Sequence, residues 1–254
     1  MYGRSVILKS MVCAVALGTL LSAQPIVPSK AGLVTYGEGQ IYIDDQVMAV
    51  PLAQSLEIGE NTVLHTGVGG VEVLLGPCAA MWIGQDSSVR LISRALADAR
   101  IELLTGSVVV ASGSLPRRAK LTVLMATVIA PIGHRGAYRF DAQPPEVKVL
   151  SGRIAVRRAE KQISVAGGRL LVLEPQPKVR KFDIRVADPL EDWSRDRAIT
   201  LAGGLNPHSV NVTARVVDGS PQMYQQRRRG IDDPMKPIPP LPNSSAFGCG
   251  VPVW

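Results

Sequence analysis

Short runs of alternating hydrophobic and polar residues occupy most of the chain between residues 33 and 173. This period of two places apolar side chains on one face of an extended strand. Turn residues such as Asp44-Asp45, Pro144-Pro145 and Gly167-Gly168 separate the runs. The pattern predicts an all-β fold with little helix. We expect strands at residues 39–43, 46–50, 62–65, 71–75, 101–104, 107–111, 121–123, 127–130, 137–141, 147–150, 153–156, 162–166 and 169–173.

One turn pattern occurs twice, as LLTGSVVV at residues 103–110 and as VLSGRIAV at residues 149–156. In each copy a strand-like run stands on both sides of a glycine, Gly106 or Gly152, which can adopt backbone angles that other residues resist. We interpret the two turns as scaffold. A weaker copy at 34–41 suggests a third, so the sequence predicts stacked β-arches or hairpins in a β-sandwich or short β-helical stack. The uneven spacing argues against a regular solenoid.

A helix is predicted over residues 188–202, where it would close the β-domain. Asp188-Pro189-Leu190-Glu191 supplies an N-cap, a proline at the first helical position and an acid three residues after the cap. Leu190, Trp193 and Leu201 fall on one side, which we expect to pack on the strands. The charged residues Asp192, Arg195 and Asp196 should face water. The alternative is a helix that docks on a partner, with Trp193 as an interaction residue.

The first 23 residues have the order of a secretory signal. Arg4 and Lys9 precede an apolar run at 11–21, and small residues follow up to Ala23. We expect export to the periplasm or cell envelope, with cleavage after Ala23. Cleavage after Ala31 and an uncleaved anchor are the alternatives, and the uncleaved segment would be the chain's only membrane contact.

Residues 203–254 differ in composition from the rest and read as a polar, Pro-rich, partly disordered tail. The run Arg227, Arg228 and Arg229 is a candidate surface-binding cluster. Near the end, Phe247 and Trp254 could dock on the domain or on a partner, or belong to a loose end. Cys78 and Cys249 both survive export, so they can form a disulfide in an oxidising compartment or remain as two thiols.

Composition adds two restrictions. The chain is 46% hydrophobic, which is enough for one good-sized core, and its formal net charge is +7. The Lys and Arg residues look scattered along the chain rather than gathered on one helix, and an exported protein rarely meets nucleic acid. We therefore expect no nucleic-acid partner.

The sequence offers no recognisable enzyme site. His65, His134 and His208 are isolated and lack metal-ligand spacing. The Gly-rich stretch at 66–70 leads into a β-run instead of a helix, so it does not resemble a phosphate cradle, and we expect it to form a turn. Turn and surface roles account for the carboxylates Asp44, Asp45, Glu72, Asp86 and Asp141. We expect no enzyme activity, no catalytic residue, no metal ligand and no cofactor.

Several of these segments together resemble a known family. They are the strand pair at 39–50, HTGVGGVEVLL (65–75), DSSVRLI (86–92), IELLTGSVVV (101–110), GAYRFD (136–141) and VKVLSGRIAV (147–156). They look like successive strands of a FecR domain, the periplasmic module named after the iron-dicitrate regulator, over residues 33–173. The following KFDIRVADPLEDWSRDRAITLA (181–202) is similar to the end of many exported, stand-alone FecR-domain proteins.

The resemblance implies a non-catalytic module of the cell envelope that binds a protein or serves as a signalling accessory. FecR-type regulators also carry a cytoplasmic region that binds a sigma factor, but only residues 1–10 precede the apolar run here. The anti-sigma role is therefore not expected. The partner is an unidentified envelope protein or cell-wall component. The alternative is a structural or polysaccharide-binding protein, for which Tyr36, Tyr42, Trp82 and Tyr138 are the available platform aromatics.

Overall fold

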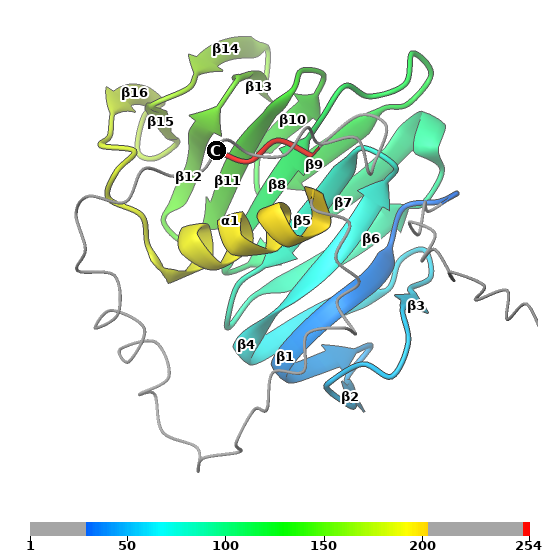
Figure 1. The fold of residues 1–254 in the computed structure, drawn as a ribbon. Helices are drawn as coiled ribbons and strands as arrows, with labels where there is room; N and C mark the ends of the chain where they lie inside the picture. The colour runs from blue at the N-terminus through cyan, green and yellow to red at the C-terminus, as the bar shows by residue number, and fades with distance from the viewer. Residues whose placement is uncertain (1–28, 203–250) are drawn as a thin grey trace, which may run out of the picture.

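The structure, a computed structural model, describes residues 29–202 and 251–254, and the regular secondary structure in this part is mostly β-strand (Figure 1). The all-β prediction is confirmed, and so is the predicted helix, α1 (Pro189–Ala202). None of the described helices is long and apolar enough to cross a membrane. A short 3-10 turn, η1, spans Leu96–Asp98. The strands are β1 (Leu33–Ile43), β2 (Gln46–Met48), β3 (Leu56–Glu57), β4 (Val63–Gly76), β5 (Ala79–Ile83), β6 (Ser88–Ser93), β7 (Ala99–Thr105), β8 (Ser107–Ser112), β9 (Leu121–Met125), β10 (Val128–Ile132), β11 (Gly136–Ala142), β12 (Pro145–Ser151), β13 (Arg153–Arg158), β14 (Lys161–Ala166), β15 (Arg169–Val172) and β16 (Lys178–Lys181).

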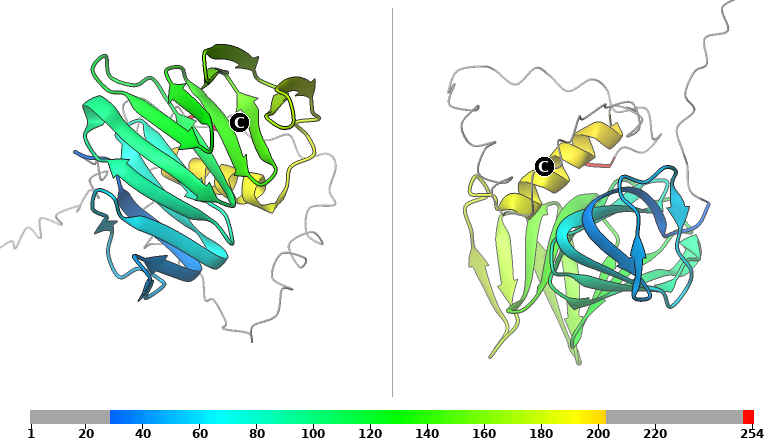
Figure 2. Two further views of the ribbon diagram at one scale, coloured as in Figure 1. Left: turned by 180° about the vertical axis from the view of Figure 1, so that it is seen from behind. Right: turned by 90° about the horizontal axis from the view of Figure 1, so that it is seen from below.

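These strands form one large sheet that folds over on itself. The order of neighbours is β14-β13-β10-β9-β7-β6-β4-β5-β8-β11-β12-β15-β16, with β1 paired to β2, β3 and β4. The half that ends in β14 and the half that ends in β16 face each other across a single hydrophobic core. The long strand β4 connects the halves, because it pairs with β6 near its start and with β5 near its end. Seen along the strands, the sheet is nearly closed (Figure 2).

The repeated turns at Gly106 and Gly152 are arches, as predicted. β7 pairs with β6 and β9, whereas β8 pairs with β5 and β11, so the chain changes from one half of the sheet to the other at Gly106. The step from β12 to β13 at Gly152 does the same. Both glycines have positive φ, +75° and +81°. The turns therefore build the fold.

The predicted third arch near residue 37 and the predicted turn at residues 66–70 are wrong. Both stretches lie inside continuous strands, β1 and β4, which pair with each other along most of their length. Gly39 and Gly69 are opposite each other there, and a Cβ on Gly39 would lie 1.9 Å from the Val68 carbonyl oxygen. These glycines allow two backbones to approach closely where the strands bend, a role that glycine also has inside strands.

A second, smaller apolar cluster lies outside the sheet. Strands β5 and β8 read AAMWI and SVVVAS, and nearly all of these residues are buried because both faces of the strands are covered. Inward side chains such as Val110 join the main core. Outward ones such as Trp82 and Val109 pack under α1 and residues 251–254. Figure 2 shows the helix lying across the outer side of the strands.

Candidate interaction surface

Helix α1 starts as the sequence predicts, with one difference. The Asp188 carboxylate caps the helix by accepting a hydrogen bond from the Glu191 backbone N–H at 3.0 Å. Glu191 does not return a reciprocal bond to the cap. Its carboxylate, only 1% exposed, instead accepts from Lys148 Nζ at 2.6 Å and from Arg139 Nη1 at 3.2 Å. The acid at the third position thus anchors the helix to β11 and β12.

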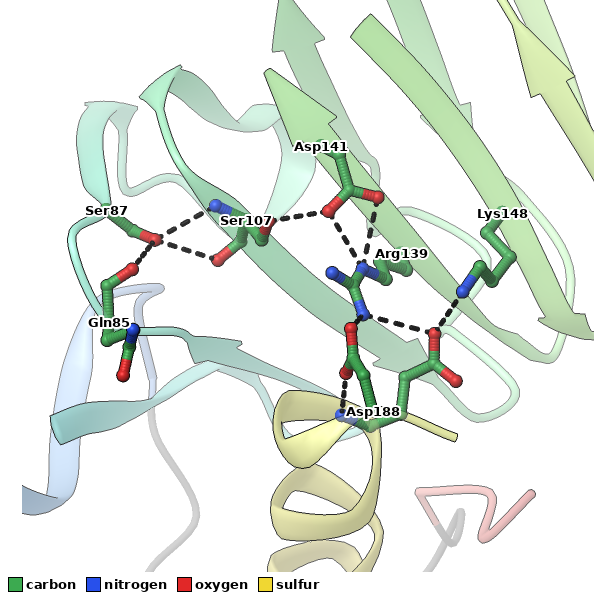
Figure 3. A network of polar contacts seen from close by, with 8 residues as sticks. Gln85, Ser87, Ser107, Arg139, Asp141, Lys148 and Asp188 are labelled. Atoms are coloured by element: carbon green, nitrogen blue, oxygen red, sulfur yellow. Dashed lines mark hydrogen bonds and ion pairs between the residues drawn. The ribbon is translucent and has the colours of Figure 1, made fainter. Parts of the chain in front are cut away.

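Arg139 is the centre of this charged cluster. Its guanidinium bonds Asp141 at 2.8 Å, pairs with Asp188 and contacts Glu191. Burial alone would lower the pKa of Arg139, but the carboxylates of Asp141 and Asp188 outweigh it and raise that pKa. Ser107 Oγ also donates to Asp141 at 2.6 Å, which extends the network to β8 (Figure 3). The helix N-terminus is therefore fixed to the sheet by mutually satisfied charges.

The Asp188 carboxylate predicts an acid dependence of stability. Burial alone would raise the pKa of Asp188, but the hydrogen bonds from Arg139 and from the Glu191 N–H outweigh it and lower that pKa. A lowered folded-state pKa stabilises the fold above the unfolded value, near 4, and this contribution is lost as the pH falls through the folded value.

Asp188→Asn keeps an N-cap oxygen but removes the charge. We expect it to lower the free energy of unfolding by about 1 kcal/mol or less at pH 7, since the carboxylate is partly exposed. Urea unfolding at pH 7, 5 and 3 should show the difference between variant and wild type shrink below pH 4. A difference that stays constant to pH 3 would contradict the role assigned to Asp188.

A second charged contact fixes the middle of the helix. Glu72 on β4 is completely buried, and its carboxylate accepts from Thr35 Oγ1 at 2.7 Å and from Trp82 Nε1 at 3.0 Å. Arg197 of α1 completes the set with two bonds, at 3.0 and 3.1 Å. We call Glu72, Thr35, Trp82 and Arg197 the helix clamp. The surface role predicted for Glu72 is therefore wrong.

Tyr36 covers the helix clamp from the side. The Arg197 guanidinium lies 3.9 Å from the centre of the Tyr36 ring, and the ring of Trp193 lies 6.4 Å from it. Burial, followed by the nearby Glu38 carboxylate, raises the pKa of Tyr36 to about 12. Trp193 also packs against Gly70 of β4. Trp193, the candidate interaction residue, thus helps to hold the helix on the sheet. This is the role predicted for the apolar side of the helix.

Residues 251–254 lie beside the helix, on the same outer face of the sheet. Val251 is buried in the outer apolar cluster, and the Trp254 ring lies 5.6 Å from that of Trp82. Arg195 donates from Nε to the Trp254 carbonyl oxygen at 2.6 Å. Arg195, expected to face water, is therefore only partly exposed. Of the three alternatives for the last residues, the structure shows docking on the domain for residues 251–254.

An open groove of about 640 Å³ lies between Trp254, the start of the helix and the segment before it. Two of its apolar side chains are exposed, Ile184 by 43% and Val186 by 72%. Charged groups of both signs stand next to them. We call this the helix-face groove; it is lined by Ile184, Arg185, Val186, Ala187, Asp192, Arg195 and Trp254.

The remaining predicted site residues are only partly placed. Arg227, Arg228, Arg229 and Phe247 lie outside the described residues. Cys78 is buried and disulfide-bonded. Its proposed partner Cys249 is also outside the described residues, so the pairing stays a prediction. The position of the neighbouring residues agrees with this pairing. Val251 follows Cys249 by two residues, Ala80 follows Cys78 by two residues, and Val251 and Ala80 lie in the same apolar cluster.

The part of the chain that the structure describes contains no group of three or more His, Cys, Asp or Glu arranged to hold a metal ion. His65 Nδ1 lies 2.8 Å from Ser88 Oγ, and its ring packs on Tyr42. His134 is in an exposed turn, and His208 is outside the described residues. The glycines at 67, 69 and 70 belong to β4 and cradle nothing at a helix end.

Comparison with known proteins gives little further guidance. No family model and no curated protein matches the sequence. Two crystal structures of a "putative anti-sigma factor" from Parabacteroides distasonis are similar at TM-scores of 0.43 and 0.42, with 11% and 12% identity. The match covers 48% of this chain and 61% of those chains. A similarity at this level assigns neither a family nor a function to the chain.

Proposed function

We propose that this chain is a non-catalytic, exported FecR-like domain protein that binds another protein of the cell envelope, as a signalling accessory, through the helix-face groove. The observation that carries the proposal is the exposure of Ile184 and Val186 beside Trp254. Apolar side chains that form the wall of a groove, with charges of both signs at its rim, are typical of a protein-binding surface.

Two further features support the proposal. The helix and residues 251–254, which are far apart in the sequence, are both held on the sheet, so the side of the groove that they form is fixed before any partner binds. Such preorganisation lowers the entropic cost of association. The segments that resemble a FecR domain also coincide with strands of the sheet, from β1 to β13.

The polysaccharide-binding alternative has less support. It requires aromatic rings exposed side by side. Of the four available rings, those of Trp82 and Tyr138 are completely buried. Tyr36 is covered by Arg197, and Tyr42 packs on His65. These four residues therefore do not form an exposed platform.

The proposal is tested by cross-linking the tagged full-length protein in its native envelope, with mass spectrometry of the adducts. Val186→Asp places a charge in the groove at a side chain that is already 72% exposed, so it should not affect folding. Val47→Asp is the matched control, because Val47 is 76% exposed and lies on β2, at another end of the domain (Figure 1). We expect one envelope protein to be captured by the wild type and by Val47→Asp, and at least a tenfold loss with Val186→Asp. Equal capture by all three would contradict the proposal.

A further inference from the structure

The chain's excess of positive charge is concentrated at one end of the domain. Residues 153–181 contain eight Lys or Arg and only two Asp or Glu, an excess of six, compared with +7 for the whole chain. They form the two hairpins β13–β14 and β15–β16, which are the two ends of the sheet and lie together in the fold (Figure 1). We call this the basic edge; its cations are Arg153, Arg157, Arg158, Lys161, Arg169, Lys178, Arg180 and Lys181.

These cations have no acidic partners among the described residues. No ion pair there includes any of the eight, although the rest of the domain pairs many of its charges. Two pairs of like charge even stand directly opposite each other on neighbouring strands, Arg158 with Lys161 and Arg169 with Lys181. Opposed like charges destabilise a strand pair. An anion from another molecule would relieve this repulsion.

Strand β16 also has a free backbone edge. Among the described strands it pairs only with β15, and all four of its residues are exposed. The Phe182 backbone N–H donates a hydrogen bond to the Gly168 carbonyl oxygen. Phe182 and Gly168 are therefore a hydrogen-bonded pair, and the next pair along the ladder is Lys181 with Arg169. In an antiparallel ladder, hydrogen-bonded residue pairs alternate with pairs that are not hydrogen-bonded. The backbone N–H and C=O groups of Lys181 and Val179 therefore point away from β15. That edge can accept another strand.

We propose that β16 binds an acidic, extended segment of a partner protein as an added strand. The free edge supplies main-chain hydrogen bonds, and the basic side chains supply charge complementarity. The same side chains exclude a second copy of β16, because Lys and Arg would then face each other across the new ladder. A membrane surface would use the charges but not the directional backbone groups. This surface is separate from the helix-face groove, and neither depends on the other.

The test uses the full-length exported protein and a fluorescent peptide, ETETETE, with blocked ends. Fluorescence anisotropy should show binding that weakens as salt rises, and no binding of the basic peptide KTKTKTK. An ETETETE peptide with alternate backbone nitrogens methylated keeps its charge but loses strand donors. It should bind at least tenfold more weakly.

Two protein variants separate the charge from the backbone edge. Arg180→Glu should weaken ETETETE binding at least tenfold, whereas Arg118→Glu, which reverses an exposed cation in the β8–β9 loop, should not. Val179→Pro removes an outward N–H that β15 does not use, and proline is tolerated at such an edge. It should also weaken binding tenfold, with an unchanged Tm.

Each contrary result overturns the proposal. No binding of ETETETE by the wild type would exclude it. If neither Val179→Pro nor backbone methylation of the peptide weakens ETETETE binding, the binding is electrostatic attraction without an added strand. Stronger binding to phosphatidylglycerol vesicles than to the peptide, lost in Arg180→Glu, would assign the basic edge to a membrane surface. The helix-face groove is tested by Val186→Asp, so the two outcomes remain distinguishable.

Discussion

Glu72→Ala should lower the free energy of unfolding by roughly 3–5 kcal/mol, because it leaves the Arg197 guanidinium partly buried without its counter-ion. It also removes the acceptor of Trp82 Nε1 and of the Thr35 hydroxyl, both in the helix clamp. Urea denaturation of the purified protein measures the effect. The helix should be the element most affected, since Glu72 is its main polar contact with β4.

A matched control is available on the surface. Glu102 pairs with Arg90 at 3.0 Å, the same distance as the shorter bond between Glu72 and Arg197, but its side chain is 32% exposed. Glu102→Ala should cost less than about 1 kcal/mol. Replacing both clamp partners, as in Glu72→Leu with Arg197→Met, should recover much of the loss, because no buried charge is then unpaired. Equal costs for Glu72→Ala and Glu102→Ala would rule out the helix clamp as a structural anchor.

The second large effect is expected at the arch between β12 and β13. A Cβ on Gly152 would lie 2.3 Å from the Arg135 carbonyl oxygen, and φ is +81°. Gly152→Val should therefore lower the free energy of unfolding by roughly 2–4 kcal/mol through backbone strain and a forced shift of the neighbouring loop.

Gly133→Val is the control for this substitution. A Cβ there would meet nothing within 4 Å. Thermal unfolding should show a clear fall in Tm for Gly152→Val and a change of only a degree or two for Gly133→Val. An unchanged Tm for Gly152→Val would show that the arch tolerates a side chain and that its glycine has another role.

The sequence was informative about the strands because most of them expose one face, so a period of two is visible in β7, β9 and β10. The arches could be predicted because glycine interrupts two otherwise similar runs. The same reasoning failed at Gly39 and Gly69, since a glycine that bends a strand and a glycine that ends one look alike in a sequence.

The polar contacts that hold the helix on the sheet, including the helix clamp, could not be found in this way. A periodicity argument detects a buried face only where that face is apolar, but the buried residues of α1 include Glu191 and Ser194. Arg197 also contacts Glu72 of the sheet. Their partners, Glu72 and Lys148, lie far away in the sequence. One signal was present: strands β5 and β8 are apolar on both faces, which indicates a second covering layer.

The basic edge was missed for a different reason. The sequence KVRK of β16 has too few apolar residues to predict a strand, and its charges look like part of a scattered background in the sequence. Counting charge over residues 153–181 would have revealed the concentration. The two hairpins follow each other in the sequence, but only the fold shows that they are the two ends of the sheet and that the outer edge of β16 is unpaired among the described strands.

The most direct test of the central claim, that the helix-face groove is where a partner protein docks, is site-specific photo-cross-linking in intact cells. A photoreactive residue at position 186 should give one discrete adduct with an envelope protein. The same residue at position 47, which is equally exposed, should give none. Adducts of equal intensity from both positions, or none from position 186, would contradict the account.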